Sequence, residues 1–400
     1  MGSRKYFLDW LRVLAFGALI VFHVGCLYAS WDYNIKSPRL LPQIDWALLA
    51  LAPWRMALLF VISGVASRYL LTKLGAGRFA LDRVRRLVPV ILVGMFVVIP
   101  PQTYIMLVDK GLMHAGYLHF WIFSYLAADQ TLVGPLHRTM PTYDHLWFIV
   151  YLLLYTLIFA AISGLLRVLG KMTRRRTFAL PHLPLWLLLI APALWLMGSN
   201  FLIERILPVT FNVVNDWGSH FKWAGLFIVG ILCASRDDFW AWVHRRRGEL
   251  LAVAAVFLGL QSLSRALWLM GGTDPVTSAL AWSATTSFYA WAMVGALCGY
   301  AQEHLNKRSA LLSHLNEAIL PIYVLHQPIL LISAYLVFPF KLPLLLEAAL
   351  LVGITGLGAF GIYETAIRPL RIMRILFGLK PNSEDKTADS KVAAAAIENG

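Results

Sequence analysis

The sequence predicts an all-α polytopic membrane protein with about ten transmembrane helices and both termini in the cytoplasm. Three observations predict this: the composition, the number of long apolar segments, and the distribution of Lys and Arg among the loops. The chain is 59% hydrophobic and 14% charged, whereas a soluble domain is typically about 25% charged. Its mean hydropathy is +0.67. This composition is typical of a protein embedded in a bilayer.

Ten apolar segments are long enough, or nearly long enough, to cross a membrane as helices. They lie at about 7–29, 46–71, 87–108, 145–167, 183–204, 220–235, 249–270, 277–301, 318–338 and 342–367. A further apolar patch, from Tyr117 to Ala127, is too short to cross and is typical of an interfacial or re-entrant helix. The N-terminus resembles a secretory signal, but Arg12 within its apolar run indicates a retained first span.

Lys and Arg alternate between the loops in a way that predicts the orientation. They concentrate between segments two and three, four and five, and six and seven, and after segments eight and ten. The other loops hold at most two each. Because cytoplasmic loops carry the excess of Lys and Arg, both termini are expected inside. The net charge of +14 is then explained by topology, and we expect no nucleic-acid partner.

Residues 1–380 are expected to form one transmembrane domain, followed by a disordered cytoplasmic tail over 381–400. The tail is polar and rich in alanine, which favours disorder. Cys26, Cys233 and Cys298 lie in or beside apolar runs without metal or redox spacing, so they are expected to be small core residues. We expect no metal ion.

The first apolar segment carries two ionisable residues, Arg12 and His23. Such side chains are costly inside a membrane helix and usually mark a functional site. Eleven helical steps turn three times with about 20° left over, so both side chains leave the same face, about 16 Å apart along the axis. A neutral imidazole can remove a proton from a hydroxyl near pH 7. His23 is therefore the first candidate catalytic residue.

Two further arginines have alternative interpretations. Arg68, at the cytoplasmic end of the second segment, could form a phosphate-binding clamp with Arg12, since Arg binds phosphate through a planar fork. It could equally be a residue that reaches from a helix end to the water. Arg265, expected near the outer end of the seventh segment, could face an anionic glycan or extend to the membrane surface in the same way.

Three residues of later segments are candidates for substrate binding. His145 and Trp147 open the fourth segment at its outer end, where a Trp is often a membrane anchor and a His is often polar filler. His326 lies within the ninth segment, shortly before Pro328. It could serve the site or bond a backbone carbonyl that the proline frees. Gly353, Gly356, Gly358 and Gly361 of the last segment are expected to pack helices.

Four motifs, in order and spacing, resemble one known family. The first segment opens with L-D-W-L-R-V-L-A and has ten residues between Arg12 and His23. It is followed by F-V-I-S-G at Phe60–Gly64, D-H-L-W-F at Asp144–Phe148 and I-Y-V-L-H-Q-P at Ile322–Pro328. Together they are similar to the acyltransferase-3 family of integral membrane acyltransferases. The segment after His145 and the ending R-P-L-R-I-M-R-I-L-F-G-L-K resemble the branch that includes glucan succinyltransferases.

The resemblance implies ten spans in a bacterial inner membrane and a defined chemistry. An acyl group, succinyl or acetyl, would move from cytoplasmic acyl-coenzyme A to a hydroxyl of an extracytoplasmic carbohydrate. By position, His23 would be the catalytic base and Arg12 would orient the donor or the site. Direct deprotonation of the acceptor and transfer through an acylated His23 both require the neutral imidazole.

Two alternatives stay open from the sequence. In the membrane-bound O-acyltransferase family the catalytic histidine lies late in the chain, so His326 would replace His23. A transporter of a small anionic solute or an acyl-modified saccharide would also place charges within its spans. Transporters often show inverted repeats and paired broken helices, and this sequence offers no matched pair.

Overall fold

The computed structural model describes residues 5–129, 140–170, 183–207 and 209–380, and in these residues it is helical with no strand. The predicted disordered tail over 381–400 lies outside the described residues. Contacts divide the chain into two compact units. Unit 1 comprises the described parts of Met1–Asp32, Arg39–Leu81 and Trp147–Asn316, and unit 2 comprises Tyr33–Pro38, Asp82–Leu146 and the described residues from Glu317 onward. The all-α prediction is confirmed.

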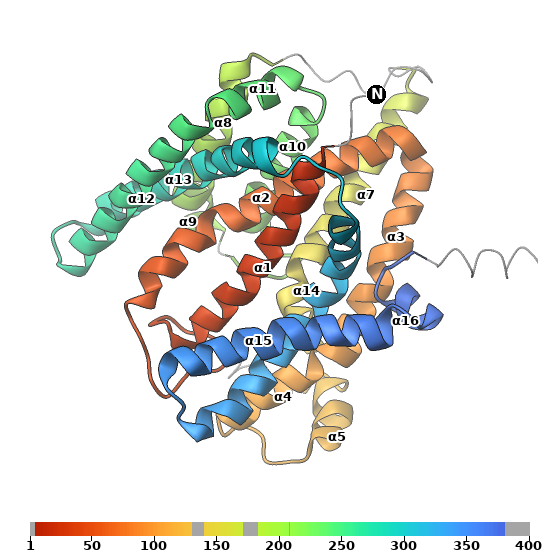
Figure 1. The fold of residues 1–400 in the computed structure, drawn as a ribbon, viewed down its shortest axis with the longest axis vertical. Coiled ribbons are helices and arrows are strands. Elements are labelled where there is room, and N and C mark those ends of the chain that lie inside the picture. Colours follow the sequence, from red (N-terminus) through yellow and green to blue (C-terminus); the bar gives the residue numbers. More distant parts are fainter. Residues whose placement is uncertain (1–4, 130–139, 171–182, 208, 381–400) are drawn as a thin grey trace, which may run out of the picture. The chain divides into compact units, whose positions relative to one another are not determined.

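Unit 1 holds the first helices of the chain and most of its middle. Within it α2 packs against α1, α10 and α13, and α12 and α13 form an antiparallel pair (Figure 1). Its helices are α1 (Tyr6–Tyr28), α2 (Ile44–Leu74), α7 (Trp147–Val168), α8 (Leu185–Gly198), η4 (Ser199–Ile203), α9 (Glu204–Ile206), α10 (Trp217–Cys233), α11 (Asp237–Arg245), α12 (Arg247–Leu269) and α13 (Pro275–His304).

Unit 2 holds the predicted third segment, the short apolar patch and the C-terminal helices. Two long helices, α3 (Ala76–Val93) and α14 (Ala310–Val337), begin in unit 1 and continue into unit 2. Its remaining elements are η1 (Gly94–Val98), α4 (Pro100–Asp109), α5 (Tyr117–His119), η2 (Phe120–Tyr125), η3 (Asp144–Leu146), η5 (Phe338–Phe340), α15 (Leu344–Ile362), η6 (Tyr363–Ile367) and α16 (Arg371–Leu376).

Eight helical stretches among the described residues are long and apolar enough to cross a membrane. They are Tyr6–Tyr28, Ile44–Leu74, Ala76–Asp109, Asp144–Val168, Leu185–Ile206, Arg247–Leu269, Ala310–Phe340 and Leu344–Ile367. The two other predicted segments coincide with α10 and α13. Helix α10 has 17 residues, which is short for a span. Helix α13 carries hydroxyl side chains that lower its hydropathy: Thr277, Ser278, Ser283, Thr285, Thr286 and Ser287.

The short apolar patch is helical, as predicted, and packs on α4. Phe120 and Tyr125 are buried in a cluster with Met106 and Leu107. The Tyr125 hydroxyl donates to the Met95 carbonyl at 2.8 Å, within the irregular turn η1. Burial raises the pKa of Tyr125 well above its ordinary value, so this hydroxyl keeps the proton that it donates.

Helices α2 and α10 approach closely through two glycines. A Cβ on Gly64 would lie 2.1 Å from the Phe227 carbonyl oxygen, and a Cβ on Gly230 would lie 2.1 Å from the Val61 carbonyl oxygen. No side chain fits at either position, so the small residues let the two backbones meet. Gly64 is the last residue of the F-V-I-S-G motif, so close packing of α2 against α10 explains why this motif ends in glycine.

The four glycines of α15 behave differently. A Cβ on Gly353, Gly356 or Gly361 would meet no described heavy atom within 4 Å, and one on Gly358 would only touch Ile329 at an ordinary 3.7 Å. The prediction that these residues pack helices was therefore wrong for the described part of the chain. Spacing along one helix does not reveal whether another helix lies opposite.

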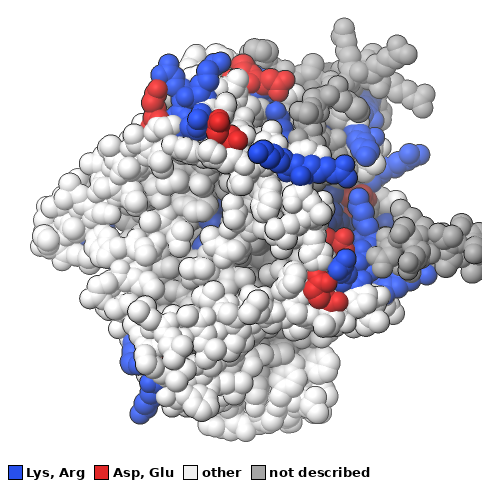
Figure 2. All heavy atoms as spheres, in the orientation of Figure 1, with Lys and Arg blue, Asp and Glu red and all other residues white. Residues whose placement is uncertain are grey.

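Charged side chains of unit 1 gather where α11 lies, α12 begins and α13 ends, while the flank of α12 and α13 in view is uncharged (Figure 2). His244 and Arg247 both contact Glu303, at 2.6 and 3.5 Å. A hydrogen bond from Arg236 lowers the pKa of Asp238 to about 2. A helical hairpin that spans a bilayer has charged residues at an end that reaches water and apolar side chains on the face toward lipid, and α12 and α13 have this distribution.

Replacement of Gly64 by Ala is expected to destabilise the protein by about 1–3 kcal/mol, because the new methyl group forces α2 and α10 apart. Thermal unfolding of the purified protein in detergent measures the loss. Gly353→Ala is the matched control: it gains helix propensity without a clash, so its midpoint should be unchanged or slightly higher. Equal midpoints for the two variants would contradict the close approach.

Candidate active site

Helix α1 presents Arg12 and His23 on one uninterrupted helix. The helix runs from Tyr6 to Tyr28 without a proline and ends at Ala29 in an extended conformation. Both side chains are partly buried, while most of their neighbours on α1 are fully buried. The structure thus confirms the helix on which the same-face argument rests, and the catalytic role of these residues stays a prediction.

Arg12 is held by two polar side chains within unit 1. Its Nη2 donates to the Asn316 side-chain oxygen on α14 and lies 3.5 Å from Asp9 Oδ1, one turn earlier on α1. Asp9 and Asn316 fix the guanidinium, since each of its five donors has a defined direction. Arg68 is buried on α2, and its backbone carbonyl accepts a hydrogen bond from Thr72 at 2.9 Å. The predicted clamp between Arg12 and Arg68 stays a prediction.

Arg55, which was not among the candidates from the sequence, is a buried cation of α2 that lies over Phe22, the residue before His23 on α1. Arg55 lies within α2, is 4% exposed, and its guanidinium carbon lies 3.8 Å above the Phe22 ring. The Phe22 ring is in turn 5.7 Å from the His23 ring, centroid to centroid. The signal was present, because an Arg in the middle of an apolar run is the same observation that identified Arg12.

Trp147 lies in an aromatic cluster that α2, α7 and α10 share. Its ring is 6.2 Å from that of Phe60 and 5.9 Å from that of Trp223, which stacks on Phe60 at 5.3 Å. Phe60 opens the F-V-I-S-G motif and is fully buried. The structure therefore brings two of the family-like motifs together through their aromatic rings, within unit 1.

His145 and His326 face each other within unit 2. They are 6% and 1% exposed, and their rings stand perpendicular with centroids 5.4 Å apart. The Tyr323 hydroxyl donates to the His145 carbonyl, and its ring stacks on His326 at 5.7 Å. Sequence analysis proposed both histidines as substrate-binding residues but did not predict that they form a pair.

Backbone carbonyls of α14 fix the proton positions on both rings. His145 Nε2 lies 3.1 Å from the Val324 oxygen, and His326 Nδ1 lies 2.6 Å from the Tyr323 oxygen. A carbonyl only accepts, so each of these nitrogens carries the hydrogen. The second nitrogen of each neutral ring then holds a lone pair. On His145 this atom, Nδ1, is buried and forms no hydrogen bond with any described residue.

Pro328 explains why Val324 needs a partner. A proline has no N–H, so the carbonyl four residues before it loses its helical hydrogen bond. That carbonyl belongs to Val324, and it is His145, on a different helix, that donates to it. Sequence analysis had considered His326 for this task. His326 instead bonds the carbonyl of Tyr323, three residues earlier.

Arg265 is ion-paired with Asp45 within unit 1, an outcome that neither sequence interpretation contained. Its Nη2 lies 3.2 Å from Asp45 Oδ2, and its guanidinium carbon lies 5.7 Å from the Trp46 ring. Asp45 also accepts from the Ser30 backbone N–H at 3.0 Å and from the Ser30 hydroxyl. Ser30 directly follows α1, so this carboxylate joins α12 and α2 to the end of the helix that carries His23.

Within the described residues, no group of three His, Cys, Asp or Glu side chains is arranged to hold a metal ion. The three cysteines are buried and unpaired by disulfides, in agreement with the core positions expected for them.

Comparison with known proteins identifies the family. The family model described as an acyltransferase domain, that of acyltransferase-3, matches residues 5–364. The chain belongs to the acyltransferase-3 family. Glucans biosynthesis protein C from Salmonella paratyphi B and from Salmonella dublin are each 25% identical to it, over 95% of this chain and 96% of theirs. No solved structure matches.

Membership of the acyltransferase-3 family makes the chain a membrane acyltransferase. The resemblance predicted from four short motifs is thereby confirmed over nearly the whole chain. The match does not support the two alternatives, a transporter or a member of the membrane-bound O-acyltransferase family with its catalytic histidine late in the chain.

Replacement of His145 by Ala should cost about 1–3 kcal/mol of stability, because it leaves the Val324 carbonyl buried without a donor. Pro328→Ala restores an N–H four residues after Val324. In that background the cost of His145→Ala should fall by about 1 kcal/mol. Denaturation of the four proteins in detergent completes the cycle.

Pro321→Ala provides the matched control, since the carbonyl it would satisfy belongs to Glu317. It should leave the cost of His145→Ala unchanged. Strict additivity of His145→Ala and Pro328→Ala would show that the imidazole does not substitute for the missing N–H.

Proposed function

We propose that this acyltransferase moves an acyl group, succinyl or acetyl, from cytoplasmic acyl-coenzyme A to a hydroxyl of an extracytoplasmic glycan. The observation that carries the proposal is the pair of Arg12 and His23 on the unbroken helix α1. Three helical turns separate a fixed cation from a partly buried imidazole. This spacing suits a donor that enters from one side of the membrane and an acceptor that arrives from the other.

The proposed orientation supports a cytoplasmic donor. With α10 and α13 added to the eight candidate spans, the chain has ten spans and the loops rich in Lys and Arg face the cytoplasm. Coenzyme A carries several phosphates, which guanidinium groups bind well. Arg12, fixed by Asp9 and Asn316, and Arg68 are the proposed donor-binding residues.

A glycan acceptor is supported by the name of the related Salmonella proteins, glucans biosynthesis protein C, which concerns the biosynthesis of glucans. The proposed location is the inner membrane of a bacterium, with lipid as the surrounding partner. His145, His326, Trp147 and Arg265 are the proposed substrate-binding residues. The ring N–H of each paired histidine is already donated to a backbone carbonyl, so the buried Nδ1 of His145 is the proposed acceptor for a sugar hydroxyl.

The chemistry requires one proton acceptor and good alignment. His23 removes the proton from the acceptor hydroxyl, the oxygen attacks the thioester carbonyl, the C–S bond breaks, and the thiol of coenzyme A leaves with the proton. In the two-step form, a nitrogen of His23 attacks the thioester carbonyl and the thiolate of coenzyme A leaves; the acceptor hydroxyl then attacks the acyl-imidazole, its proton passes to the thiolate, and His23 is regenerated. Arg12 orients the donor in both, since alignment supplies much of the rate when the acyl group is already activated.

Replacement of His23 by Ala should lower acyl transfer by at least about 100-fold, the range expected for loss of a general base. Purified protein is incubated with labelled acyl-coenzyme A and a glucan acceptor, and acylated product is measured by mass spectrometry. His304→Ala, at the exposed end of α13, is the matched control and should retain the parent rate.

Two outcomes would contradict the proposal. Parent-like transfer in His23→Ala would remove His23 from the chemistry. Accumulation of a solute in proteoliposomes, with no loss of thioester in the parent protein, would indicate transport instead.

The Arg12→Lys variant keeps the positive charge but removes the planar guanidinium group, so it tests which of the two the donor requires. Because Lys offers a point charge and no planar fork, the KM for acyl-coenzyme A should rise about tenfold while the KM for the glucan acceptor stays constant. Initial rates at varied donor and acceptor concentrations measure both. An equal rise in both constants would show that Arg12 does not act on the donor.

A further inference from the structure

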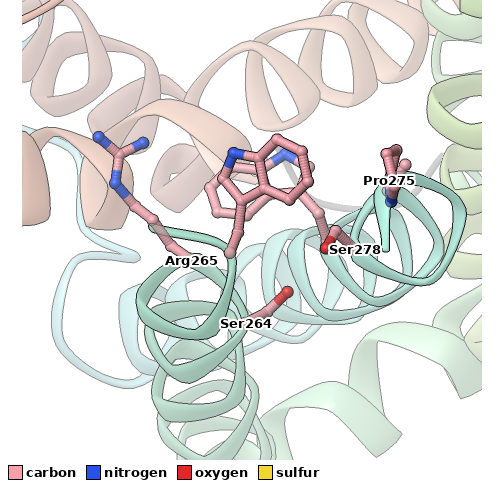
Figure 3. A pocket seen from close by; sticks show the side chains of 7 residues that line it. Ser264, Arg265, Pro275 and Ser278 are labelled. Carbon is pink, nitrogen blue, oxygen red and sulfur yellow. The ribbon is translucent and has the colours of Figure 1, made fainter. Parts of the chain in front are cut away.

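A pocket lies between the last turns of α12 and the first turns of α13, within unit 1 (Figure 3). Its volume is about 270 Å³, close to the lower limit of small-ligand sites of roughly 300 Å³. This size suits one sugar residue rather than a coenzyme. The lining residues are Ser264, Arg265, Trp268, Pro275, Ser278, Ala279 and Trp282.

The side chains of the pocket combine flat apolar walls with hydroxyl groups. Trp268 and Trp282 supply indole rings, and Ser264 and Ser278 supply hydroxyls that donate or accept. A sugar has the complementary surface, with C–H faces that pack on an aromatic ring and hydroxyls at the ring edge. The pocket therefore fits a polyhydroxylated ligand.

The charge of the pocket argues against a phosphate. Arg265 is the only charged residue among the described residues that line it, and Asp45 lies 3.2 Å from that guanidinium. The pair is neutral as a whole, so the pocket offers no net positive charge to an anion. An uncharged saccharide loses nothing by this, because the outward-facing donors of Arg265 can still bond a sugar oxygen.

Hydrogen bonds place the pocket at the His23 end of α1. Arg265 bonds Asp45, and Asp45 bonds both the backbone N–H and the hydroxyl of Ser30. Ser30 follows His23 by seven residues. In the proposed orientation the opposite end of α12, at Arg245, Arg246 and Arg247, is cytoplasmic, so the pocket opens on the side from which the acceptor arrives.

A buried amide continues the polar face of α12 below the pocket. Gln261 is 1% exposed, and neither its Oε1 nor its Nε2 forms a hydrogen bond with a described residue. It precedes Ser264, Arg265 and Trp268 by three, four and seven positions, which places all four on one helix face. An unbonded buried amide lowers stability. Gln261 lies one helical turn before the lining residue Ser264, and a bound sugar is the proposed source of its missing partner.

We propose that this pocket binds a sugar residue of the acceptor glycan other than the one that is acylated. The inference rests on the proposed function and names the acceptor subsite of that reaction. Binding of a neighbouring residue would hold the reacting hydroxyl near His23 and raise its effective concentration.

The test uses full-length protein in lipid nanodiscs, free of sugar-headed detergent, and glucose tetrasaccharides that differ in linkage. Saturation-transfer difference NMR titrations give the Kd of each. At least one tetrasaccharide should bind, and Trp268→Ala and Trp282→Ala should each weaken it at least about fivefold. Trp186→Ala, which removes a 61% exposed indole of α8, is the matched control and should change the Kd less than twofold.

Three results would overturn the inference. The first is that no tetrasaccharide binds with a Kd below about 10 mM, which is a limit of weak binding. The others are that the pocket variants have the same Kd as Trp186→Ala, or that phosphatidylglycerol in the nanodisc displaces the bound sugar. Gln261→Leu guards against misfolding, because it removes the amide at similar volume. This variant should raise the Kd of the tetrasaccharide without lowering the midpoint of thermal unfolding. A parent-like Kd in this variant would remove Gln261 from the site.

Acyl transfer separates this inference from the proposed function. If both hold, Trp282→Ala raises the KM for the acceptor at least about fivefold and leaves acyl-coenzyme A hydrolysis unchanged. Sugar binding without any acyl transfer would overturn the proposed reaction and retain the pocket. Acyl transfer with an unchanged acceptor KM in both Trp variants would retain the proposed reaction and overturn the sugar pocket.

Discussion

Polar groups that this chain buries within apolar helices must find their partners inside the protein, because lipid offers no hydrogen bonds. Val324 shows the rule at its simplest, since Pro328 removes its helical donor and His145 replaces it from another helix. Asp45 shows it for a charge, with Ser30 and Arg265 around one carboxylate. In both cases the need for a partner joins elements that are far apart in sequence.

The same bonds that satisfy the fold also set the state of the candidate site residues. His145 and His326 each donate one ring N–H to a carbonyl of α14, which fixes the tautomer and leaves the other nitrogen as an acceptor. Arg12 is oriented by Asp9 and Asn316 in a comparable way. The helix irregularity at Pro328 thus helps to orient His145, whereas Arg12 depends on two side chains.

Periodicity and composition predicted the helices well, because apolar runs and helical spacing are local properties of the chain. The eight candidate spans, the helical patch at Tyr117, and the unbroken α1 all follow from such local signals. Arg55 was also visible in the sequence as a charge within an apolar run.

The partners of these side chains were not predictable, because they depend on which helices meet. Asp45 and Arg265 are 220 residues apart, and His145 and Val324 are 179 apart. A single sequence holds no signal that links such positions. The glycines illustrate the same limit: Gly64 and Gly230 form a close contact, whereas the four glycines of α15 have no described backbone atom opposite them.

The unequal burial of the helices explains where polar residues are tolerated. In the apolar window of α14, 67% of residues are buried, whereas in that of α12 only 11% are. A helix as exposed as α12 can bear polar side chains at membrane depth only on the face that another helix covers. Gln261, Ser264 and Arg265 share one such face: Ser264 and Arg265 line a pocket with residues of α13, and Arg265 is ion-paired with Asp45 of α2. A polar residue on a mostly lipid-exposed helix thus marks a face shielded by protein, and that shield is also what a sugar needs in order to bind beside a membrane.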